Sequence, residues 1–306
     1  MKKKIKIQST DGKNKLHVIL WEPEGDIKAV VQISHGMLEH IDRYEEFAQY
    51  LNAHNILVVG NDHLGHGHTA KSGDMGYFGN GKSKTVVDDL NSVTRYVKKH
   101  FGYDVPYFLL GHSMGSFMIG RYIMTYGKEV SGAIFCGTGY TPHFKLEFIH
   151  AILSIIKIFK GERYRSSFLK NTIFGGYNKK IDSPKSENDW LTRDEETISD
   201  YDNDKYNAFL FTINGYETLF DVIKFFQNKD NIDKIPKNLP VYLASGKEDP
   251  VGNYGKGVTK VYNMYKKSGI KDVHMKLYED DRHEIINELD KDIVHKDILT
   301  WIEQHI

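Results

Sequence analysis

The sequence contains one cysteine, Cys136, among its 306 residues. A single cysteine excludes an intramolecular disulfide and a cysteine-rich metal site, and it fits a reducing compartment. Cys136 ends the apolar run GAIFC. In such a run we expect a buried, unreactive thiol rather than a nucleophile.

An excess of charge of either sign is also absent, since 41 basic and 41 acidic side chains give a formal net charge of +0. This balance argues against a protein that binds nucleic acid through a strongly basic surface, so nucleic acid is not an expected partner.

Long hydrophobic runs are missing as well. The longest is FIHAILSIIKIF at residues 148–159, which is too short to span a bilayer and is interrupted by Lys157. The basic N-terminal stretch MKKKIKIQSTDG has no apolar stretch of signal-peptide length behind it. We therefore expect a cytoplasmic protein.

Short runs typical of β-strands recur along the chain, and helical patterns separate most of them, which predicts a sheet with crossover helices. The continuous apolar runs among them are typical of strands covered on both faces. Only DGKNK separates the first two runs, so we expect an antiparallel hairpin at one edge. The predicted strands are residues 5–10, 16–23, 29–36, 56–62, 107–112, 131–137, 241–246 and 273–280.

Residues 140–206 interrupt this alternation, because they contain no clear strand and are rich in aromatic, charged and turn residues. We interpret them as a helical cap inserted between two parts of an α/β core, residues 1–139 and 207–306. A helix over residues 148–159 would carry a narrow polar stripe of His150, Ser154 and Lys157. Its wide apolar arc is either buried, lines an acyl-chain site or touches a membrane surface.

The fifth predicted strand runs into GHSMGS, and a helical pattern follows at once. Strand, sharp turn and helix form the context of a nucleophile elbow, which exposes a serine hydroxyl at the carboxyl edge of a sheet. We expect glycine at positions 111 and 115 for a steric reason, because larger side chains there would collide with the strand and the helix. The pattern predicts that Ser113 is a nucleophile.

A serine nucleophile needs a histidine base, and the histidine needs an acid to fix its tautomer. In the expected order of serine, acid and histidine, Asp249 follows the strand VYLAS and His283 follows the strand VHMKLYE. Both would therefore reach the same sheet edge as Ser113. The acids that compete with Asp249 are Glu248, Asp280 and Asp281.

The tetrahedral intermediate of acyl transfer needs two N–H donors for its oxyanion. The backbone N–H of Met114, directly after the serine, is one candidate. The other is the N–H of Met37, in the loop SHGMLEH, where Gly36 lets the backbone approach closely. His35, Gly36 and His112 are expected to support this region, and for His35 and Glu39 bracing of the loop is favoured over catalysis.

Residues 76–83, GYFGNGKS, match the phosphate-binding pattern G-x-x-x-x-G-K-[ST]. That pattern needs a preceding strand, and HTAKSGDM is not one. We interpret the stretch as a surface loop with Lys82 in solvent, leading into a helix that begins near Thr85 with Asp88 completing a capping box.

A second competing pattern is DHLGHGHT, which gathers His63, His66 and His68. Clustered histidines can bind zinc. Their spacing matches no motif with defined mechanics, so structural hydrogen bonding is favoured and no metal is expected.

These motifs resemble the α/β-hydrolase superfamily, in particular its monoglyceride lipase and lysophospholipase-like branch. Two stretches, HGMLEHIDRYEEFA and NDHLGHGHT, resemble loops of that branch, and GHSMGS resembles its nucleophile elbow. The stretch WLTRDEETISDYDNDK resembles the end of its cap. The stretches GKEDPVG and RHEIINE resemble the loops that carry its catalytic acid and histidine. The resemblance covers nearly the whole chain. It implies an eight-stranded, mostly parallel sheet with helices on both faces and a mobile helical cap, the triad Ser113, Asp249 and His283, oxyanion N–H groups at Met37 and Met114, and no cofactor.

The chain departs from the branch's pattern at Leu64, His68 and Ser116, and DNDKY lacks a proline after Asp204. The triad is untouched, whereas the cap differences affect substrate choice. The sequence therefore predicts a carboxylic ester hydrolase that acts on a small-molecule ester of monoacylglycerol or lysophospholipid type. A short-chain carboxylesterase, a thioesterase or an aminopeptidase could use the same triad, and a nucleotide-binding protein or a non-catalytic ligand sensor are the alternatives of another class.

Overall fold

A computed structural model describes the backbone of residues 1–306 and the side chains of all of them except residues 81 and 82. One eight-stranded sheet in the order β1-β2-β4-β3-β5-β6-β7-β8 forms its centre. β2 is antiparallel to both β1 and β4, and all other neighbours are parallel. The strands are β1 (Lys2–Gln8), β2 (Lys15–Trp21), β3 (Ala29–Ser34), β4 (Ile56–Asn61), β5 (Tyr107–His112), β6 (Gly132–Cys136), β7 (Val241–Gly246) and β8 (Val273–Tyr278).

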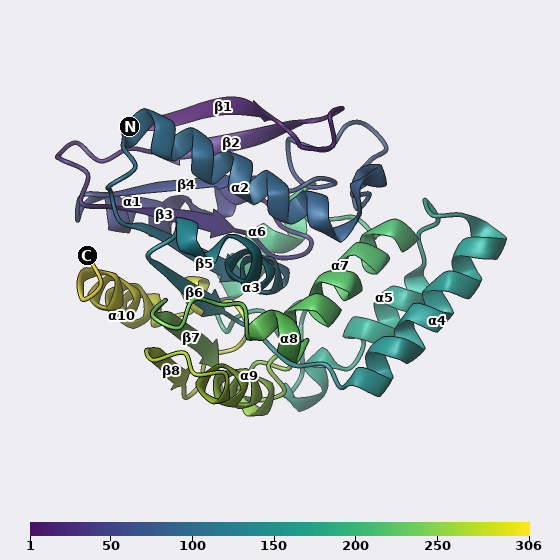
Figure 1. Cartoon of the computed structure of the whole chain (residues 1–306). Coiled ribbons are helices and arrows are strands. Elements are labelled where there is room, and N and C mark those ends of the chain that lie inside the picture. Colours follow the sequence, from purple (N-terminus) through teal and green to yellow (C-terminus); the bar gives the residue numbers. More distant parts are fainter.

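Helices cover both faces of this sheet (Figure 1). Side chains of α2, α3, α7 and α9 form the core on one face, and those of α1 and α10 form the core on the other. The helices are α1 (Glu45–Asn52), α2 (Lys82–Phe101), α3 (Met114–Tyr126), α4 (His143–Lys160), α5 (Ser167–Phe174), α6 (Glu195–Asn203), α7 (Ile213–Phe226), α8 (Lys229–Ile232), α9 (Lys256–Lys267) and α10 (Lys291–Glu303).

The apolar pattern explains the strand positions. Every residue of β3, β4, β5, β6 and β7 is buried, as expected for strands with helices on both faces. β1 is largely exposed and pairs only with β2, so the predicted edge hairpin is confirmed. The predicted mostly parallel α/β sheet is confirmed with it.

The segment predicted as a cap contains α4, α5, α6 and a 3₁₀ turn at Tyr177–Lys180, and α4 and α5 project beyond α7 at the right of Figure 1. Its only strand-like feature among the described residues is an isolated bridge between Arg165 and Thr212. Within the part of the chain that the structure describes, no helix is both long and apolar enough to cross a membrane.

One face of α4 packs on α7 through the buried Leu146 and Leu153, and Ile149, Ile152 and Ile156 are half-buried against the same core. The wide apolar arc of residues 148–159 is therefore only partly buried, and its exposed side chains are Phe148, Ile155, Ile158 and Phe159. His150 and Lys157 of the predicted polar stripe lie against the acids Asp221 and Glu217 of α7.

The stretch GYFGNGKS forms a turn rather than a phosphate loop. Its amide groups are used internally, since Gly76 N–H donates to Gly65 O at 2.7 Å and Phe78 N–H donates to Asn214 Oδ1 at 2.9 Å. A Cβ on Gly76 would lie 2.7 Å from Leu210 O, which explains the glycine by close backbone approach. The expectation that Lys82 sits in solvent lies outside the described side chains.

The predicted start of the following helix is wrong. A 3₁₀ turn at Gly79–Gly81 leads directly into α2, which begins at Lys82, so Thr85 lies inside the helix and is no cap. Asp88 does not complete a capping box, because its carboxylate accepts hydrogen bonds from Lys84 Nζ and from Tyr126 OH, the latter at 2.7 Å. The tertiary contact with α3 outweighs the local capping signal.

Candidate active site

Ser113 occupies the turn between β5 and α3, with φ 51° and ψ −118°. This backbone region is sparsely populated for residues other than glycine, and it indicates strain. The Ser113 N–H donates to Cys136 O of the neighbouring strand at 2.9 Å. The turn is therefore held by β6 while the side chain lies in a cavity.

The two glycines around Ser113 allow the strand and the helix to meet. A Cβ on Gly115 would lie 1.8 Å from Ser34 O, and one on Gly111 would lie 2.5 Å from Gly115 O. Any larger residue would push α3 away from β3 or β5. The predicted steric role of both glycines agrees with these distances.

Asp249 and His283 lie close together, as the sequence predicts. Asp249 Oδ1 is 3.0 Å from His283 Nδ1, and their side chains are 0% and 1% exposed. The carboxylate also accepts the Val251 N–H at 2.8 Å and the Ser245 hydroxyl at 3.1 Å. These donors hold the carboxylate in position to orient the imidazole ring.

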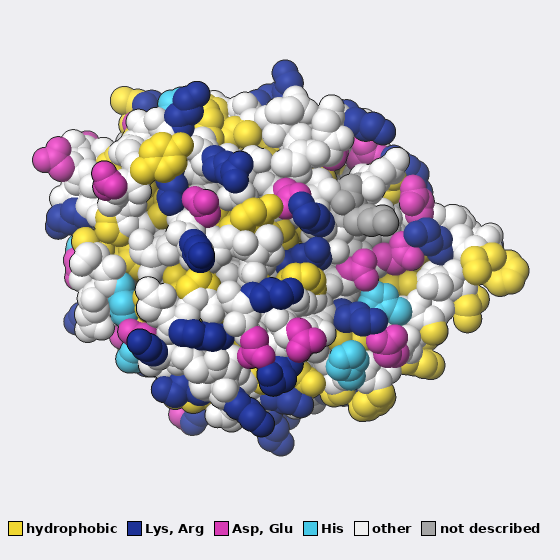
Figure 2. All heavy atoms as spheres, in the orientation of Figure 1, with side chains coloured by type: hydrophobic (Ala, Val, Ile, Leu, Met, Phe, Trp, Pro, Cys, Tyr) yellow, Lys and Arg dark blue, Asp and Glu magenta, His cyan; other side chains and the backbone are white. Residues whose placement is uncertain are grey.

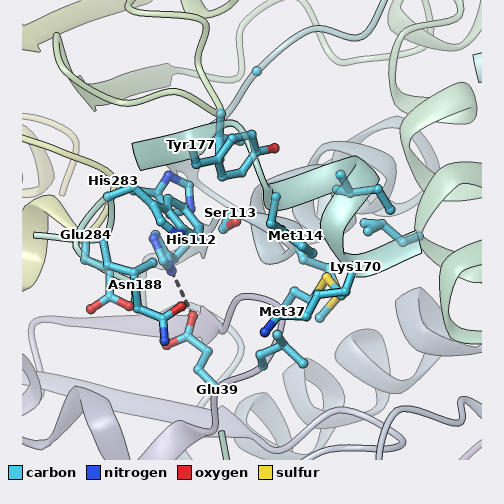
Figure 3. Close-up of a pocket in the computed structure, with 18 of the residues that line it drawn as sticks. Met37, Glu39, His112, Ser113, Met114, Lys170, Tyr177, Asn188, His283 and Glu284 are labelled. Atoms are coloured by element: carbon cyan, nitrogen blue, oxygen red, sulfur yellow. Dashed lines mark hydrogen bonds and ion pairs between the residues drawn. The ribbon is translucent and has the colours of Figure 1, made fainter. Parts of the chain in front are cut away.

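The other ring nitrogen of His283, Nε2, is buried and has no hydrogen-bond partner among the described residues. His283 and Ser113 line the same cavity (Figure 3). A neutral imidazole held at Nδ1 leaves Nε2 as a proton acceptor, which is what an activated serine requires.

The competing acids lie elsewhere. Glu248 and Asp280 are exposed, and Asp281 forms an ion pair with Arg193 at 2.8 Å. Of the four carboxylates considered from the sequence, the one hydrogen-bonded to His283 is Asp249.

Met37 and Met114 also line the cavity (Figure 3). Met114 is the first residue of α3, where backbone N–H groups are unpaired and the helix dipole favours negative charge. Neither the Met37 nor the Met114 N–H donates to another group of the described chain. The two N–H groups are therefore available to an oxyanion.

Histidines brace the loop that carries Met37. His35 Nδ1 donates to Gly36 O at 2.8 Å, and its Nε2 accepts the His63 N–H at 3.0 Å. Burial lowers the pKa of His63 to about 3 and that of His66 to about 4, so both rings are neutral at physiological pH. The His63 and His66 ring centroids are 6.3 Å apart, whereas His68 contacts Tyr206 instead. The three histidines do not converge on one point.

Sequence reasoning missed a buried ionic network beside the serine. Glu39 accepts a hydrogen bond from His112 Nδ1 at 2.8 Å and from Arg43 Nη1 at 2.9 Å, and Arg43 binds Glu284 at 2.7 Å. Burial alone would raise the pKa of Glu39, but His112 and Arg43 hold it well below its usual range. The pKa of His112 is raised, because the nearby Glu39 carboxylate outweighs burial. In the sequence, this network could have been suspected only from the presence of Glu39 and Arg43 in the loop HGMLEHIDRY.

Cys136 is fully buried, and burial raises the pKa of its thiol to about 12. The thiol therefore stays protonated, in agreement with the expectation of an unreactive residue.

The cavity has a volume of about 350 Å³ and lies between the sheet edge that carries Ser113 and the segment predicted as a cap. Apolar side chains of α3, α5 and α7 form much of its wall, while the cap also supplies Lys170, Tyr177 and Asn188 (Figure 3). None of residues 148–159 lines this cavity. The apolar wall residues include Phe117, Ile173, Phe174, Leu219, Phe220 and Ile223.

The sheet has eight mostly parallel strands, with a strained serine after β5, an acid after β7 and a histidine after β8. This arrangement defines an α/β-hydrolase. The chain belongs to the family described as serine aminopeptidase, S33, whose model matches residues 25–290. The resemblance to α/β-hydrolases drawn from the motifs is confirmed by this match.

Individual relatives bear names of ester hydrolases. This chain is 26% identical to a monoacylglycerol lipase of Mycolicibacterium smegmatis over 290 residues. The alignment covers 94% of this chain and 92% of that protein. A monoglyceride lipase of Mus musculus is 39% identical over 101 residues, but these are only 31% of this chain and 30% of the mouse protein. The chain is thus aligned with less than a third of the mouse protein's length.

Among solved structures, a thermostable carboxyl esterase from Bacillus coagulans in complex with glycerol is similar over its whole length. It has a TM-score of 0.92 and 30% sequence identity, and the match covers 99% of this chain and 98% of that chain.

Proposed function

We propose that this protein is a serine hydrolase that cleaves carboxylic esters through an acyl-enzyme. Ser113 Oγ attacks the ester carbonyl, His283 Nε2 takes its proton and later passes it to the leaving alcohol, and Asp249 keeps the imidazole oriented. The N–H groups of Met37 and Met114 stabilise the oxyanion. The observation that carries the proposal is the buried Asp249–His283 pair, whose unpartnered Nε2 lines the same cavity as the strained Ser113.

The substrate that we favour is an acyl ester of monoacylglycerol or lysophospholipid type. The apolar wall of the cavity supports an acyl chain as the occupant, and the names of the relatives support the same class. A short-chain carboxylesterase, a thioesterase and an aminopeptidase share the required triad, so substrate measurements decide among them. The cytoplasmic location expected from the sequence, and the division into a core and a cap at residues 140–206, belong to the same proposal.

A transient contact of the cap with a lipid surface completes the proposal. On α4, the side chains of Phe148, Ile158 and Phe159 are 66%, 79% and 79% exposed. Phe144 of α4 and Phe168 of α5 are exposed as well. Figure 2 shows hydrophobic side chains gathered on the projecting tip, where α4 lies in Figure 1. An exposed apolar patch of this kind favours insertion among lipid headgroups.

A panel of esters that varies acyl length and head group tests the proposal. Hydrolysis of long-chain monoacylglycerols above short esters, thioesters and peptide amides is expected for the wild-type protein. Ser113→Ala should abolish ester hydrolysis and labelling by a fluorophosphonate probe, with an unchanged circular dichroism spectrum. Turnover retained by this variant would remove Ser113 from the mechanism.

A further inference from the structure

The cap touches the loop that carries His283 through its backbone. His283 N–H donates to Trp190 O at 3.4 Å, and Glu284 N–H donates to Leu191 O at 2.6 Å. The Trp190 ring also packs against the His283 ring, with centroids 5.0 Å apart. Residues 189–193 of the cap therefore lie along the histidine loop rather than over the cavity alone.

Arg193, at the end of this segment, binds three carboxylates that belong to the histidine loop and to the start of α10. Its Nη2 lies 2.8 Å from Asp281 Oδ1 and 2.7 Å from Asp290 Oδ1, and its Nε lies 3.0 Å from Glu288 Oε2. The side chains of Asp281 and Glu288 are 0% exposed. One guanidinium of the cap thus joins both sides of the loop that holds His283.

The contact between the cap and the histidine loop depends on Arg193, because one guanidinium faces three carboxyl groups. Without the guanidinium, Asp281 and Glu288 would be buried carboxylates with no cationic partner in contact, which is costly unless they move or take up protons. Glu288 Oε1 also accepts the Arg282 N–H at 2.9 Å, directly before His283. A shift of Glu288 would therefore move the backbone that carries the histidine.

We propose that Arg193 is a positioning residue that holds the His283 loop in its productive place. This inference rests on the proposed hydrolase function. Arg193 acts through Asp281 and Glu288, and it sets the distance from His283 to Asp249 on one side and to Ser113 on the other. A displacement of about 1 Å between reacting groups can cost on the order of 100-fold in rate.

The test compares Arg193→Ala, Arg193→Lys and the control Arg163→Ala on a small water-soluble ester. Arg163 is a matched control because it also ties the cap to the core, through Asp74 at 2.7 Å, on a different loop of the core. For Arg193→Ala we expect kcat to fall about 10- to 100-fold with KM within about twofold of wild type. Arg193→Lys should recover part of kcat, since the ammonium replaces the charge but not the three-way geometry.

Labelling by a fluorophosphonate probe gives a second measurement, because it requires the serine and histidine but no substrate head group. The labelling rate of Arg193→Ala should fall by a factor similar to the fall in kcat. The measurement is made at a temperature well below the unfolding transition of each variant. If Arg193→Ala does not fold, the double variant Arg193→Gln, Asp281→Asn removes the guanidinium together with one of its buried carboxyl partners, and the same loss of kcat is expected.

A kcat of Arg193→Ala within about twofold of wild type overturns the inference. An equal loss in Arg163→Ala also overturns it, since loosening of the cap in general would then explain the effect. Failure of the proposed function is distinguishable, because the wild type would then hydrolyse no ester or Ser113→Ala would remain active.

Discussion

Asp249 Oδ1 lies 3.0 Å from His283 Nδ1, although the two residues are 34 positions apart and follow different strands. Both side chains are almost completely buried. A carboxylate in this place accepts a hydrogen bond from the Nδ1–H group and so leaves Nε2 free to accept the serine proton.

Asp249→Asn should therefore lower kcat by about three to four orders of magnitude, since an amide at this position stabilises the wrong tautomer of the ring. Steady-state kinetics on a soluble ester measures the effect. Glu248→Gln and Asp280→Asn are matched controls, because both acids are exposed neighbours of the two loops. Equal loss of activity in a control variant would mean that charge near the site, rather than the pair, matters.

Gly115→Ala should destabilise the fold by about 3 kcal/mol, the upper end of what overpacking usually costs, because the added Cβ would lie 1.8 Å from the backbone oxygen of Ser34. Urea unfolding measures the change, and failure to obtain soluble protein is the extreme form of the same result. Gly176→Ala serves as the control, since its nearest contact would be a flexible lysine side chain at 3.7 Å. A Gly115→Ala variant as stable as wild type would show that strand and helix can separate at no cost.

The double variant Ile158→Glu, Phe159→Glu should lower activity on long-chain substrate in vesicles by about tenfold or more, because each buried apolar side chain contributes about 1.5–3 kcal/mol. Activity on a short soluble ester should stay within about twofold of wild type. Tyr103→Glu is the control, since Tyr103 is 66% exposed on the core. Equal loss for both substrates would argue against a lipid-binding role of this patch.

Acid should destabilise the protein below about pH 6.5. Burial lowers the pKa of His63 to about 3, of His66 to about 4, and of His35 well below its ordinary value. These histidines stay neutral when folded but take up protons when unfolded, so their contribution is lost as pH falls. Each costs about 1.4 kcal/mol per pH unit between about pH 6 and pH 5.

Other groups have the opposite sign, among them His112 with its raised pKa. Burial, followed by the neighbouring Asp290 and Glu288, raises the pKa of Asp281 to about 8 despite Arg193, so this carboxyl stabilises the folded state as pH falls. We expect the buried histidines to outweigh these groups, so the free energy of unfolding should fall as pH falls from about 6.5. Urea unfolding at pH 7.5, 6.0 and 5.0 checks it. His63→Gln should reduce the slope, and exposed His100→Gln should not; a flat profile contradicts the prediction.

Strands, elbow and order of the candidate triad could be predicted from local patterns. An apolar run such as YFLLGH requires burial wherever it lies, and glycines beside Ser113 are needed because only they fit between strand and helix. The start of α2 was predicted wrongly, since the helix begins at Lys82. Asp88 bonds to Tyr126 of α3 instead of capping the helix, and no local pattern reports such a contact.

The order of chemical groups along the chain, with one cysteine, no excess charge and a serine in a glycine turn, was sufficient to indicate the class of protein and to exclude others. Tertiary structure decided which of the four acids meets His283, which face of α4 is exposed, and how Arg193 and Arg43 are paired. The reason is physical: strand and turn preferences depend on neighbouring residues, whereas the Arg43–Glu284 ion pair joins residues 241 positions apart, and it exists only once the chain is folded.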